Sequence, residues 1–381
     1  MSRAKISAGL DSLGEYASLL RGRRISIMTN PTGVDSKFRS VIDIVHERFN
    51  LTALFACEHG IRGDMDAGMK VDSITDERTG APVYSLYGST LRMTDEMLSS
   101  FDVLIFDMQD VGARFYTYLY SLSYAMDSCA KAGKNIFVLD RPNPLGGNIT
   151  EGLILDESYG SFVGEYAIPA RYGLTIGEYA LWVKKHLSLD LDMTVVPLKG
   201  WRREYILSDI AYLWISPSPN IPCLESALCY IGTSIFEGTN LSEGRGTTVP
   251  FQVVGAPWLN GRKLSSRMND LEFPGIYFRE CSFIPSMSKH KGEVCHGVQL
   301  HITDKETSSI FAAGIYLLEE IRLMDPESFE YLGSGEKTHF DRILGSGLYR
   351  NGKISARELV KSAADDSAAF ALEKREFEIY N

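Results

Sequence analysis

The feature that most constrains the fold is a regular alternation in the first half of the chain. Short apolar runs at residues 24–29, 51–56, 102–107, 135–140 and 193–197 are separated by helically spaced segments at 40–49, 93–99, 118–132 and 175–187. Strands that are apolar on both sides are typical of a parallel sheet covered by helices on both faces. The alternation therefore predicts an α/β fold for this half of the chain.

The pattern of turns and apolar residues changes after about residue 250. Turn signals become frequent, as at residues 255–257 and 273–275, and residues 298–302 have the pattern of an antiparallel strand. Helices are predicted at 307–322, 355–362 and 364–376. A chain of 381 residues is long enough for two domains. We predict a first domain at 1–249 and a second, smaller α+β domain at 250–381, with the active-site cleft between them.

Charge and hydropathy exclude several classes of protein. The net charge is −10 and the chain has no long basic stripe, so we expect no nucleic-acid partner. No apolar run approaches the roughly 18 residues of a membrane-spanning helix. Residues 1–7 lack the apolar region of an export signal. We therefore expect a cytoplasmic protein, or a periplasmic or extracellular one if the chain is a processed or trimmed form.

Polar residues follow each of the first four predicted strands. In an open parallel sheet, ligands bind beyond the carboxyl ends of the strands, so these residues are expected to share one rim. Turns account for the glycines and prolines there, and some arginines could pair with acids simply to hold the rim. The candidate binding residues at the rim are Asn30, Glu58, His59, Arg62, Asp107, Gln109, Asp110, Arg114, Tyr116, Asp140, Arg141 and Asn143.

Two later stretches are also rich in hydrogen-bonding side chains. Residues 238–248 contain Asn240, Glu243 and Arg245 and show no apolar period. This stretch is interpreted as a loop facing the cleft, the alternative being a well-satisfied loop that crosses between the domains. Residues 216–222 form a proline-rich turn before a helix, and Asn220 could present its amide to a ligand there.

This mixture of carboxylates, amides, arginines and aromatics suits the binding of a sugar. Glycoside hydrolysis needs a proton donor at the leaving oxygen and a second group that activates water or stabilises the transition state. Glu58 is the candidate acid, because its place at a strand end suggests partly apolar surroundings that favour the protonated form. Candidates for the second role are Asp110 and Glu243, with Asp107 and Asp140 as further possibilities.

No cofactor or metal is expected. The sequence contains no G-x-G-x-x-G after the first strand, no G-x-x-x-x-G-K-[ST] and no G-x-S-x-G. The histidines at 59, 290, 296 and 301 do not have the spacing of a ligand pair. Six cysteines are scattered without a C-x-x-C pair, so we expect most of them to be buried and reduced.

Four segments together resemble the NamZ-type exo-β-N-acetylmuramidases: FACEHGIRG at 55–63, DMQDVGARFYTY at 107–118, LDRPNPLGG at 139–147 and GTNLSEGRGTTVP at 238–250. The resemblance runs from about Gly9 to the end of the chain. It implies a Rossmann-like first domain, a smaller second domain and release of terminal N-acetylmuramic acid (MurNAc) from peptidoglycan-derived disaccharides or muropeptides. It also places the catalytic glutamate of the family on Glu58.

The lactyl carboxylate of MurNAc, which N-acetylglucosamine (GlcNAc) lacks, is expected to be bound by an arginine. The candidates are Arg62, Arg114, Arg141 and Arg245, of which Arg62 and Arg245 are favoured. Two alternatives stay open at this point. The chain could be a sugar-phosphate or nucleotide-sugar enzyme, although a glycine-rich phosphate cradle is lacking, or a non-catalytic protein that binds muropeptides.

Overall fold

The computed structural model describes residues 3–58, 60–62, 74–88 and 90–381. Its larger sheet has the strand order β3-β4-β2-β1-β5-β6-β7. All of these strands are parallel to their neighbours except β3, which is antiparallel to β4. The bounds are β1 Arg24–Thr29, β2 Asn50–Ala56, β3 Ile74–Thr75, β4 Pro82–Ser85, β5 Val103–Asp107, β6 Asn135–Leu139 and β7 Met193–Val196.

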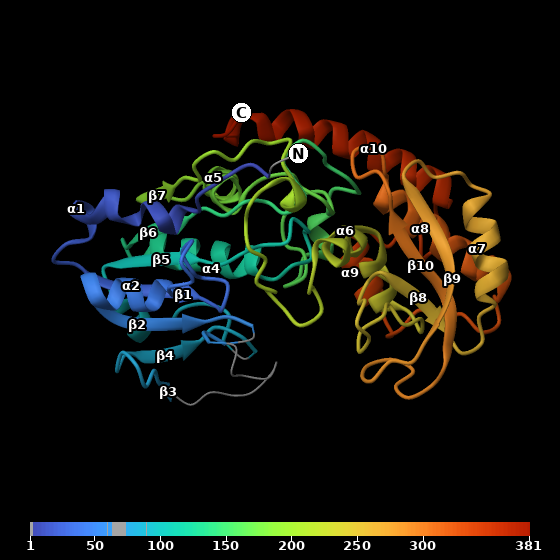
Figure 1. Cartoon of the computed structure of the whole chain (residues 1–381), viewed down its shortest axis with the longest axis horizontal. Helices are drawn as coiled ribbons and strands as arrows, with labels where there is room; N and C mark the ends of the chain where they lie inside the picture. The colour runs from blue at the N-terminus through green and yellow to red at the C-terminus, as the bar shows by residue number, and fades with distance from the viewer. Residues whose placement is uncertain (1–2, 59, 63–73, 89) are drawn as a thin grey trace.

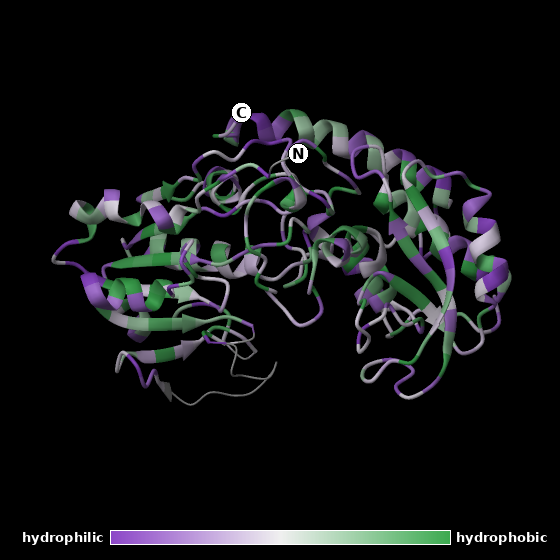
Figure 2. Cartoon of the chain, viewed as in Figure 1, coloured by the Kyte–Doolittle hydropathy of each residue, from purple (hydrophilic) through white to green (hydrophobic). Residues whose placement is uncertain are grey.

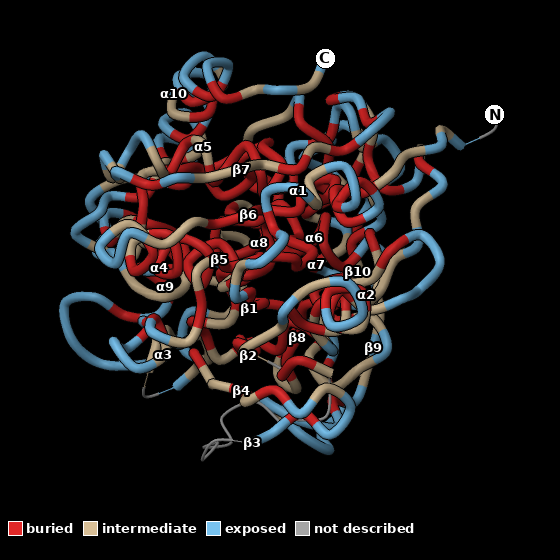
Figure 3. The backbone as a smooth tube through the Cα atoms, turned by 90° about the vertical axis from the view of Figure 1, so that its left-hand side faces the viewer, coloured by how far each residue is buried: buried red, intermediate tan, exposed pale blue. Residues whose placement is uncertain are grey.

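Both faces of this sheet are buried, which explains the continuous apolar strands. In β5, Val103 and Ile105 join one apolar core, whereas Leu104 and Phe106 join another. Helices η1 (Gly9–Tyr16), α1 (Ala17–Leu20) and α2 (Val41–Arg48) cover the first face, and α4 (Tyr118–Lys131) and α5 (Ile176–His186) cover the second. The central strands β1, β5 and β6 are accordingly almost entirely buried, as Figure 3 shows. The predicted α/β fold with a helix-covered parallel sheet is confirmed.

Local signals set several helix starts in this part. The Ser40 hydroxyl accepts the backbone N–H of Ile42 at the start of α2. Thr175 and Glu178 form a capping box at the start of α5. The short helix α3 is Asp95–Ser99, and the 3₁₀ turns are η2 Glu157–Tyr159 and η3 Leu207–Asp209.

The smaller part is built on a three-stranded antiparallel sheet in the order β8-β10-β9. Its strands are β8 Val253–Ala256, β9 Ile276–Phe283 and β10 Cys295–Ile302. Its helices are α6 Leu224–Thr233, η4 Ser234–Gly238, α7 Gly261–Asn269, α8 Ile310–Met324, α9 His339–Leu344, α10 Ala356–Glu373 and η5 Lys374–Phe377. Figure 1 shows this part on the right, beside the parallel sheet. The predicted second α+β unit is thus confirmed as a fold class.

The two parts are not separated by a break in the core. One apolar cluster runs from Phe106 and Met126 beside the parallel sheet to Ile231, Val254 and Phe311 in the smaller part. Figure 2 shows green, apolar stretches in both parts of the molecule. Helix α6 packs against α8 although it precedes residue 249 in the chain. The boundary at residues 249 and 250 stays a prediction.

The end of the chain returns to the first part. Helix α10 lies along the top of the molecule in Figure 1 and leads the chain back toward the parallel sheet. The Trp182 indole N–H donates to Glu373, and Lys374 donates to the carbonyl of Gly147 at 2.8 Å. Two separate helices had been predicted at 355–362 and 364–376; this prediction is wrong, because α10 is one continuous helix. Residues 362–364, which lie at the junction of the two predicted helices, continue the helix without interruption.

Candidate active site

A cavity of about 330 Å³ lies between the two parts of the molecule. Its first wall comes from the carboxyl edge of the parallel sheet and the loops that follow β2, β4 and β5. Its second wall comes from α6, η4 and the loop before β8. The lining residues are Glu58, Tyr87, Phe115, Tyr116, Thr117, Phe162, Val163, Ser218, Asn220, Ile221, Tyr230, Glu237, Arg245 and Phe251.

Glu58 stands on the first wall directly after β2. Its side chain is half-buried, and two hydroxyl groups bind its carboxylate. Tyr87 donates to Oε1 at 2.8 Å, and Thr117 donates to Oε2 at 3.0 Å. Burial, followed by the charge of Glu58, raises the pKa of Tyr87 to about 12. Tyr87 therefore remains a neutral hydrogen-bond donor, and the two hydroxyls fix the orientation of the Glu58 carboxyl.

Glu237 and Arg245 form the charged part of the second wall. Arg245 Nη2 lies 2.7 Å from Glu237 Oε1, and its guanidinium is 5.1 Å from the centre of the Phe251 ring. His339 Nε2 lies 3.5 Å from Glu237 Oε2. Burial alone would raise the pKa of Glu237, but His339 and Arg245 lower it below its ordinary value. Glu237 is therefore an ionised carboxylate on the cavity wall.

Glu243, a predicted catalytic residue, lies behind this second wall. It is almost fully buried, with Oε2 at 2.7 Å from Lys289 Nζ and Oε1 at 3.3 Å from Arg245 Nε. Lys289 also donates to the carbonyls of Phe236 and Thr239. In this arrangement Glu243 holds Arg245 through Nε, whereas Glu237 contacts Nη2, and Glu243 does not itself line the cavity.

Aromatic rings make up much of the apolar lining. Phe115 meets Tyr230 edge to face at a centroid distance of 4.9 Å, and Tyr230 contacts Phe251 at 4.4 Å. Tyr116, a predicted binding residue, lines the cavity but is largely buried against Tyr118 at 4.8 Å. Asn220, also predicted, lines the cavity and is half-buried. Aromatic faces beside polar groups suit the two sides of a sugar ring.

The acids that follow β5 and β6 are bound by the scaffold instead. Asp107 forms a buried ion pair with Arg141, at 2.6 Å between Asp107 Oδ1 and Arg141 Nε. Asp140 accepts from the backbone N–H groups of Arg141 and Gly177, and from the hydroxyls of Thr175 and Tyr380. Burial raises the pKa of Asp140 to about 7. These residues stabilise the rim beneath the cavity and do not line it.

Asp110, the other predicted catalytic acid, is buried as well. It accepts from the backbone N–H of Gly112 at 2.6 Å and from the hydroxyl of Tyr172. Burial raises its pKa to about 6. Gly112 has a φ of +81°, and a Cβ there would lie 2.5 Å from Oδ1 of Asn143, so this tight turn requires glycine. Asn143 itself accepts from the N–H of Leu145 and donates to the carbonyl of Leu174.

Two predicted arginines are engaged away from the cavity. Arg114 is fully buried and donates to the carbonyls of Leu153, Ile168, Ile343 and Leu344, which joins the β5–α4 loop to the end of α9. Burial lowers its pKa to about 10. Arg62 binds Asp76 at 2.7 Å and lies 3.6 Å from Asp43.

The remaining predicted residues have local roles or are not described. Asn30 accepts from the N–H and hydroxyl of Thr32, and Asn240 bridges the backbone of Ser328 and Glu330. Gln109 lines a separate, smaller pocket. His59 lies outside the described residues, as does Gly63 of the FACEHGIRG segment.

Several cavity residues were missed from the sequence. Thr117 and Phe115 lie within the DMQDVGARFYTY segment, so their position after β5 was an available signal. Glu237 lies in η4, one residue before the 238–248 stretch, and no pattern in the sequence marks it as a cavity residue. Tyr87 and Phe162 come from loops that no periodic pattern marks.

Within the described ranges, no group of three or more His, Cys, Asp or Glu side chains is arranged to hold a metal ion. No helix in this part of the chain combines the length and apolar character that a membrane crossing requires. All six cysteines are free thiols, and four of them are buried. The described residues that line the cavity provide carboxylates, hydroxyls, an arginine and aromatic rings.

The fold and the cavity together define a class. A glutamate fixed by two hydroxyls faces an ionised carboxylate and an arginine across an aromatic-lined cavity, at the edge of an α/β sheet. Such a set of groups is typical of proteins that bind or hydrolyse carbohydrates.

Comparison with known proteins identifies the family. Residues 25–225 match the N-terminal model of the exo-β-N-acetylmuramidase NamZ family, and residues 228–380 match its C-terminal model. The chain is 45% identical to the peptidoglycan β-N-acetylmuramidase NamZ of Bacillus subtilis (strain 168), over 99% of this chain and 92% of that protein. The chain therefore belongs to the exo-β-N-acetylmuramidase NamZ family.

Two solved structures of DUF1343 family proteins from Bacteroides fragilis NCTC 9343 have the same fold. The first superposes with a TM-score of 0.91 at 36% identity, over 100% of both chains. The second has a TM-score of 0.77 at 32% identity, over 99% of both chains.

Proposed function

We propose that this chain is an exo-acting glycoside hydrolase that releases terminal MurNAc from peptidoglycan fragments such as MurNAc–GlcNAc. One observation carries the proposal. In a chain of this family, Glu58 lies in the cavity between the two parts with both carboxylate oxygens held by hydroxyls. The name of the Bacillus subtilis relative supports the same substrate. The cavity holds the terminal sugar, and the rest of the fragment extends out of it.

Glu58 acts as the general acid. Its carboxyl donates a proton to the glycosidic oxygen while the bond from that oxygen to the anomeric carbon breaks. Water supplies the hydroxyl group that the anomeric carbon gains, and its remaining proton restores the protonated form of Glu58, so the products are free MurNAc and the shortened fragment. Tyr87 and Thr117 are positioning residues, because their hydroxyls hold the carboxyl of Glu58 in a fixed orientation. A fixed donor avoids reorganisation during the proton transfer.

Glu237 is our candidate for the second carboxylate. It lines the cavity on the wall that the smaller part supplies, and its pKa is lowered by His339 and Arg245. An ionised carboxylate at this place can activate water or stabilise positive charge at the anomeric carbon. Asp110 and Glu243, which the sequence also suggested for catalysis, are enclosed by fixed partners. We propose that they stabilise the two walls of the cavity.

Arg245 is the arginine best placed to bind the lactyl carboxylate of MurNAc. It lines the cavity, whereas Arg62 is paired with Asp76 and Asp43 outside it. Because Glu237 and Glu243 share the charge of Arg245, the guanidinium is held in place before substrate binds. Asn220 and Tyr116 complete our proposed binding set, through an amide and an aromatic edge.

The test is hydrolysis of a chromogenic aryl β-N-acetylmuramide by the wild type and by Glu58→Gln. We expect release by the wild type and a loss of about a hundredfold or more in the variant, since general acid catalysis contributes about 10²–10⁴-fold. Glu204→Gln, a surface carboxylate change, is the matched control and should retain wild-type turnover. Circular dichroism and thermal unfolding establish that each variant is folded.

Two outcomes would contradict the proposal. Wild-type turnover that survives Glu58→Gln would remove Glu58 from the acid role. Tight binding of MurNAc–GlcNAc by a folded wild type without turnover would favour a muropeptide-binding protein instead.

A further inference from the structure

The Glu58 cavity adjoins a second hollow across the side chain of Phe162. This groove encloses about 500 Å³ and is lined by Leu91, Tyr124, Glu157, Gly160, Ser161, Phe162, Glu165, Tyr166, His186 and Leu187. Phe162 lines both the groove and the cavity. Apart from Tyr124 and Tyr166, every residue of the groove is half-buried or exposed, so a ligand can reach its walls.

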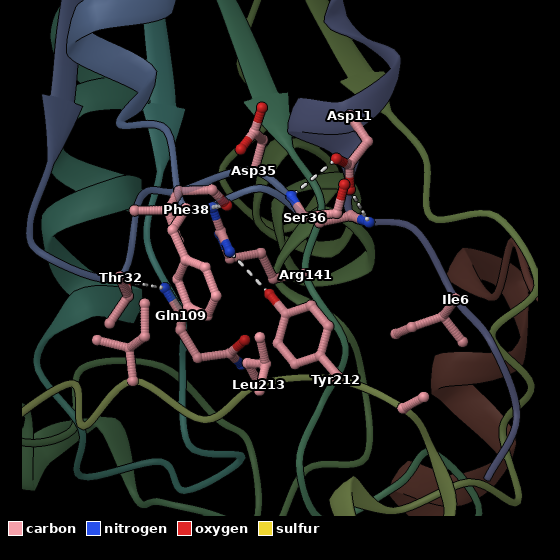
Figure 4. A pocket seen from close by; sticks show the side chains of 14 residues that line it. Ile6, Asp11, Thr32, Asp35, Ser36, Phe38, Gln109, Arg141, Tyr212 and Leu213 are labelled. Atoms are coloured by element: carbon pink, nitrogen blue, oxygen red, sulfur yellow. Dashed lines mark hydrogen bonds between the residues drawn. The ribbon is translucent and has the colours of Figure 1, made fainter.

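The small pocket that Gln109 lines offers no comparable space. It encloses about 90 Å³, whereas pockets that bind small molecules usually have about 300–1,000 Å³. Figure 4 shows its charged groups already bound, since Arg141 donates to the Tyr212 hydroxyl and Asp11 accepts backbone N–H groups. It also shares no lining residue with the Glu58 cavity. A second sugar beside the first therefore has room in the groove and not in this pocket.

The position of Glu58 decides on which side of the cavity the leaving sugar lies. A general acid must be within hydrogen-bond reach of the oxygen that it protonates, so the leaving sugar is bound on the Glu58 side. Tyr87 donates to Glu58 Oε1 at 2.8 Å, and the centre of its ring is 6.3 Å from that of Phe162. The Tyr87 side chain thus spans the distance from the acid to Phe162, and the groove lies beyond the Phe162 ring.

Phe162 is fixed at the tip of a tight turn. Ser161 and Gly164 exchange two backbone hydrogen bonds, at 2.7 and 3.0 Å, so Phe162 and Val163 occupy the two tip positions. The Phe162 ring stacks on Tyr124, with ring centres 6.0 Å apart and an angle of 28° between the planes. Because Phe162 is half-buried, its ring is held in place and still offers apolar surface to one face of a sugar.

The charge of the groove disfavours an anion. Glu157 and Glu165 line it, and no lysine or arginine does so among the described residues. His186 Nε2 lies 3.2 Å from Glu157 Oε1. Arg92, which lies nearby, is paired with Asp127 at 2.5 Å. A groove with this charge and with aromatic rings suits a neutral sugar better than one that carries a carboxylate.

We propose that the groove binds the sugar that leaves, a neutral N-acetylhexosamine, while the cavity holds the terminal MurNAc. Phe162 packs on one face of the leaving sugar, and the Glu157 carboxylate and the Ser161 hydroxyl bind its hydroxyl groups at the rim. The inference rests on the proposed hydrolase function and adds a second, adjoining sugar site. Charge then sets the direction in which a disaccharide binds, because Arg245 attracts the lactyl carboxylate into the cavity and the groove repels it.

The test uses the full chain with the substitution Glu58→Gln, so that MurNAc–GlcNAc stays intact, and with ¹³C-labelled Ile, Leu and Val methyl groups observed by NMR. Methyls of Leu91 and Leu187 report on the groove, and those of Val163 and Ile221 report on the cavity. The probes are MurNAc–GlcNAc and the methyl β-glycoside of MurNAc, which lacks the leaving sugar. We expect the disaccharide to shift both pairs of methyls and the methyl glycoside to shift the cavity pair alone.

The outcomes separate this inference from the proposed function. Shifts at Val163 and Ile221 without shifts at Leu91 and Leu187 would overturn the groove assignment and leave the proposed function intact. No shift at any of the four residues at millimolar concentration would overturn both. The sulfur-linked analogue of MurNAc–GlcNAc resists hydrolysis, so the same measurement can be made on the wild type if Glu58→Gln does not fold.

A matched pair of ligands tests the preference for a neutral leaving sugar. Reduction of the GlcNAc unit of MurNAc–GlcNAc gives an alditol, and its oxidation gives an aldonate. Both leaving units are open chains, but only the aldonate carries a charge. We expect the aldonate to bind about fivefold more weakly, which is the order of the interaction between exposed charges. Equal or tighter binding of the aldonate would overturn the assignment of a neutral sugar to the groove.

Two variants test the position of the site. In the Glu58→Gln chain, Leu91→Arg places a long side chain in the groove and should weaken binding of the disaccharide, relative to the methyl glycoside, about tenfold. Leu323→Arg, at an exposed leucine on α8, is the control and should preserve the ratio of the two affinities. Thermal unfolding establishes that both variants are folded. An unchanged ratio in a folded Leu91→Arg chain would overturn the proposal.

Discussion

The carboxylates that follow β5 and β6 differ sharply from those that face the cavity, although both groups look alike in the sequence. Asp107, Asp110 and Asp140 are enclosed by an arginine, backbone N–H groups and tyrosine hydroxyls. Glu58 and Glu237 are held from one side and open to the cavity on the other. The residue type thus indicates a polar rim, but the packing around each acid decides between support and chemistry.

The sharpest test of this difference is Arg141→Met. The change leaves Asp107 buried without its partner, and breaking a buried ion pair from one side costs about 3–5 kcal/mol of the free energy of unfolding. Chemical denaturation measures the loss. Arg202→Met, in a solvent-exposed pair with Glu204, should leave the transition nearly unchanged. Equal effects of the two variants would show that the buried pair is not part of the scaffold.

The burial of Asp140 predicts a pH dependence of the free energy of unfolding. Burial raises the pKa of Asp140 to about 7 in the folded protein, against 3.8 ordinarily. Between these two pH values the folded state keeps a proton on Asp140 that the unfolded state releases. The contribution of Asp140 to the free energy of unfolding is therefore fully present below about pH 4 and is lost as pH rises toward 7. The loss is about 4 kcal/mol at most.

We expect Asp140→Asn to flatten the pH dependence of the unfolding free energy between about pH 4 and 7, measured by denaturation at several pH values. Asp102→Asn is the control. Hydrogen bonds from Arg24 lower the pKa of Asp102 to about 2, so its contribution is present above pH 4 and lost below that range. An unchanged slope in Asp140→Asn would contradict the assignment.

The two favoured arginines allow a comparison of an arginine that lines the cavity with one that does not. Arg245→Met should lower kcat/KM for an aryl MurNAc glycoside by about 10–100-fold, because a charge-assisted contact of roughly 1.5–3 kcal/mol is lost. The rate for the matching GlcNAc glycoside should fall much less. Arg62→Met, outside the cavity, should preserve the ratio of the two rates. Loss of discrimination in Arg62→Met alone would reverse our assignment, and equal wild-type rates on both glycosides would exclude recognition of the lactyl group.

The smallest expected effect concerns the hydroxyls that hold Glu58. Tyr87→Phe removes one donor and should lower kcat/KM about fivefold, in line with about 1 kcal/mol for a hydrogen bond. Steady-state kinetics over a range of pH provides the measurement. Tyr277→Phe, at an exposed position on β9, is the control. A fully active Tyr87→Phe enzyme would mean that Thr117 alone positions the acid.

Much of the fold could be predicted because its signals are local. The strand at 24–29 coincides with β1, since a strand buried on both faces must be apolar throughout. Strand β9 was missed, because in Ile276–Phe283 buried and exposed side chains alternate only over the first four residues, and the consecutive Arg279 and Glu280 are both exposed. The break predicted within α10 failed because alanine and serine tolerate the helix there.

The site was less predictable for a physical reason. Glu58 could be named because it follows a strand end and lies in a recognisable segment. Glu237 reaches the cavity through the packing of η4 against α9, a contact between segments about a hundred residues apart. Asp110 has the right chemistry at the right edge, but its burial depends on Tyr172, which lies 62 residues away along the chain. Such partners leave no local pattern.

The packing of residues 374–380 against the parallel sheet also has a consequence for folding during synthesis. Tyr380 completes the hydrogen bonds of Asp140, and Lys374 binds the carbonyl of Gly147, so the rim of the parallel sheet depends on partners that follow α10 in the sequence. The ribosome makes Tyr380 240 residues after Asp140. While the chain is still being translated, the sheet can form, but Asp140 lacks its final partner. Completion of the rim therefore waits until α10 and the residues after it have been made, and a nascent chain that stalls before α10 would expose an unfinished edge to chaperones and proteases.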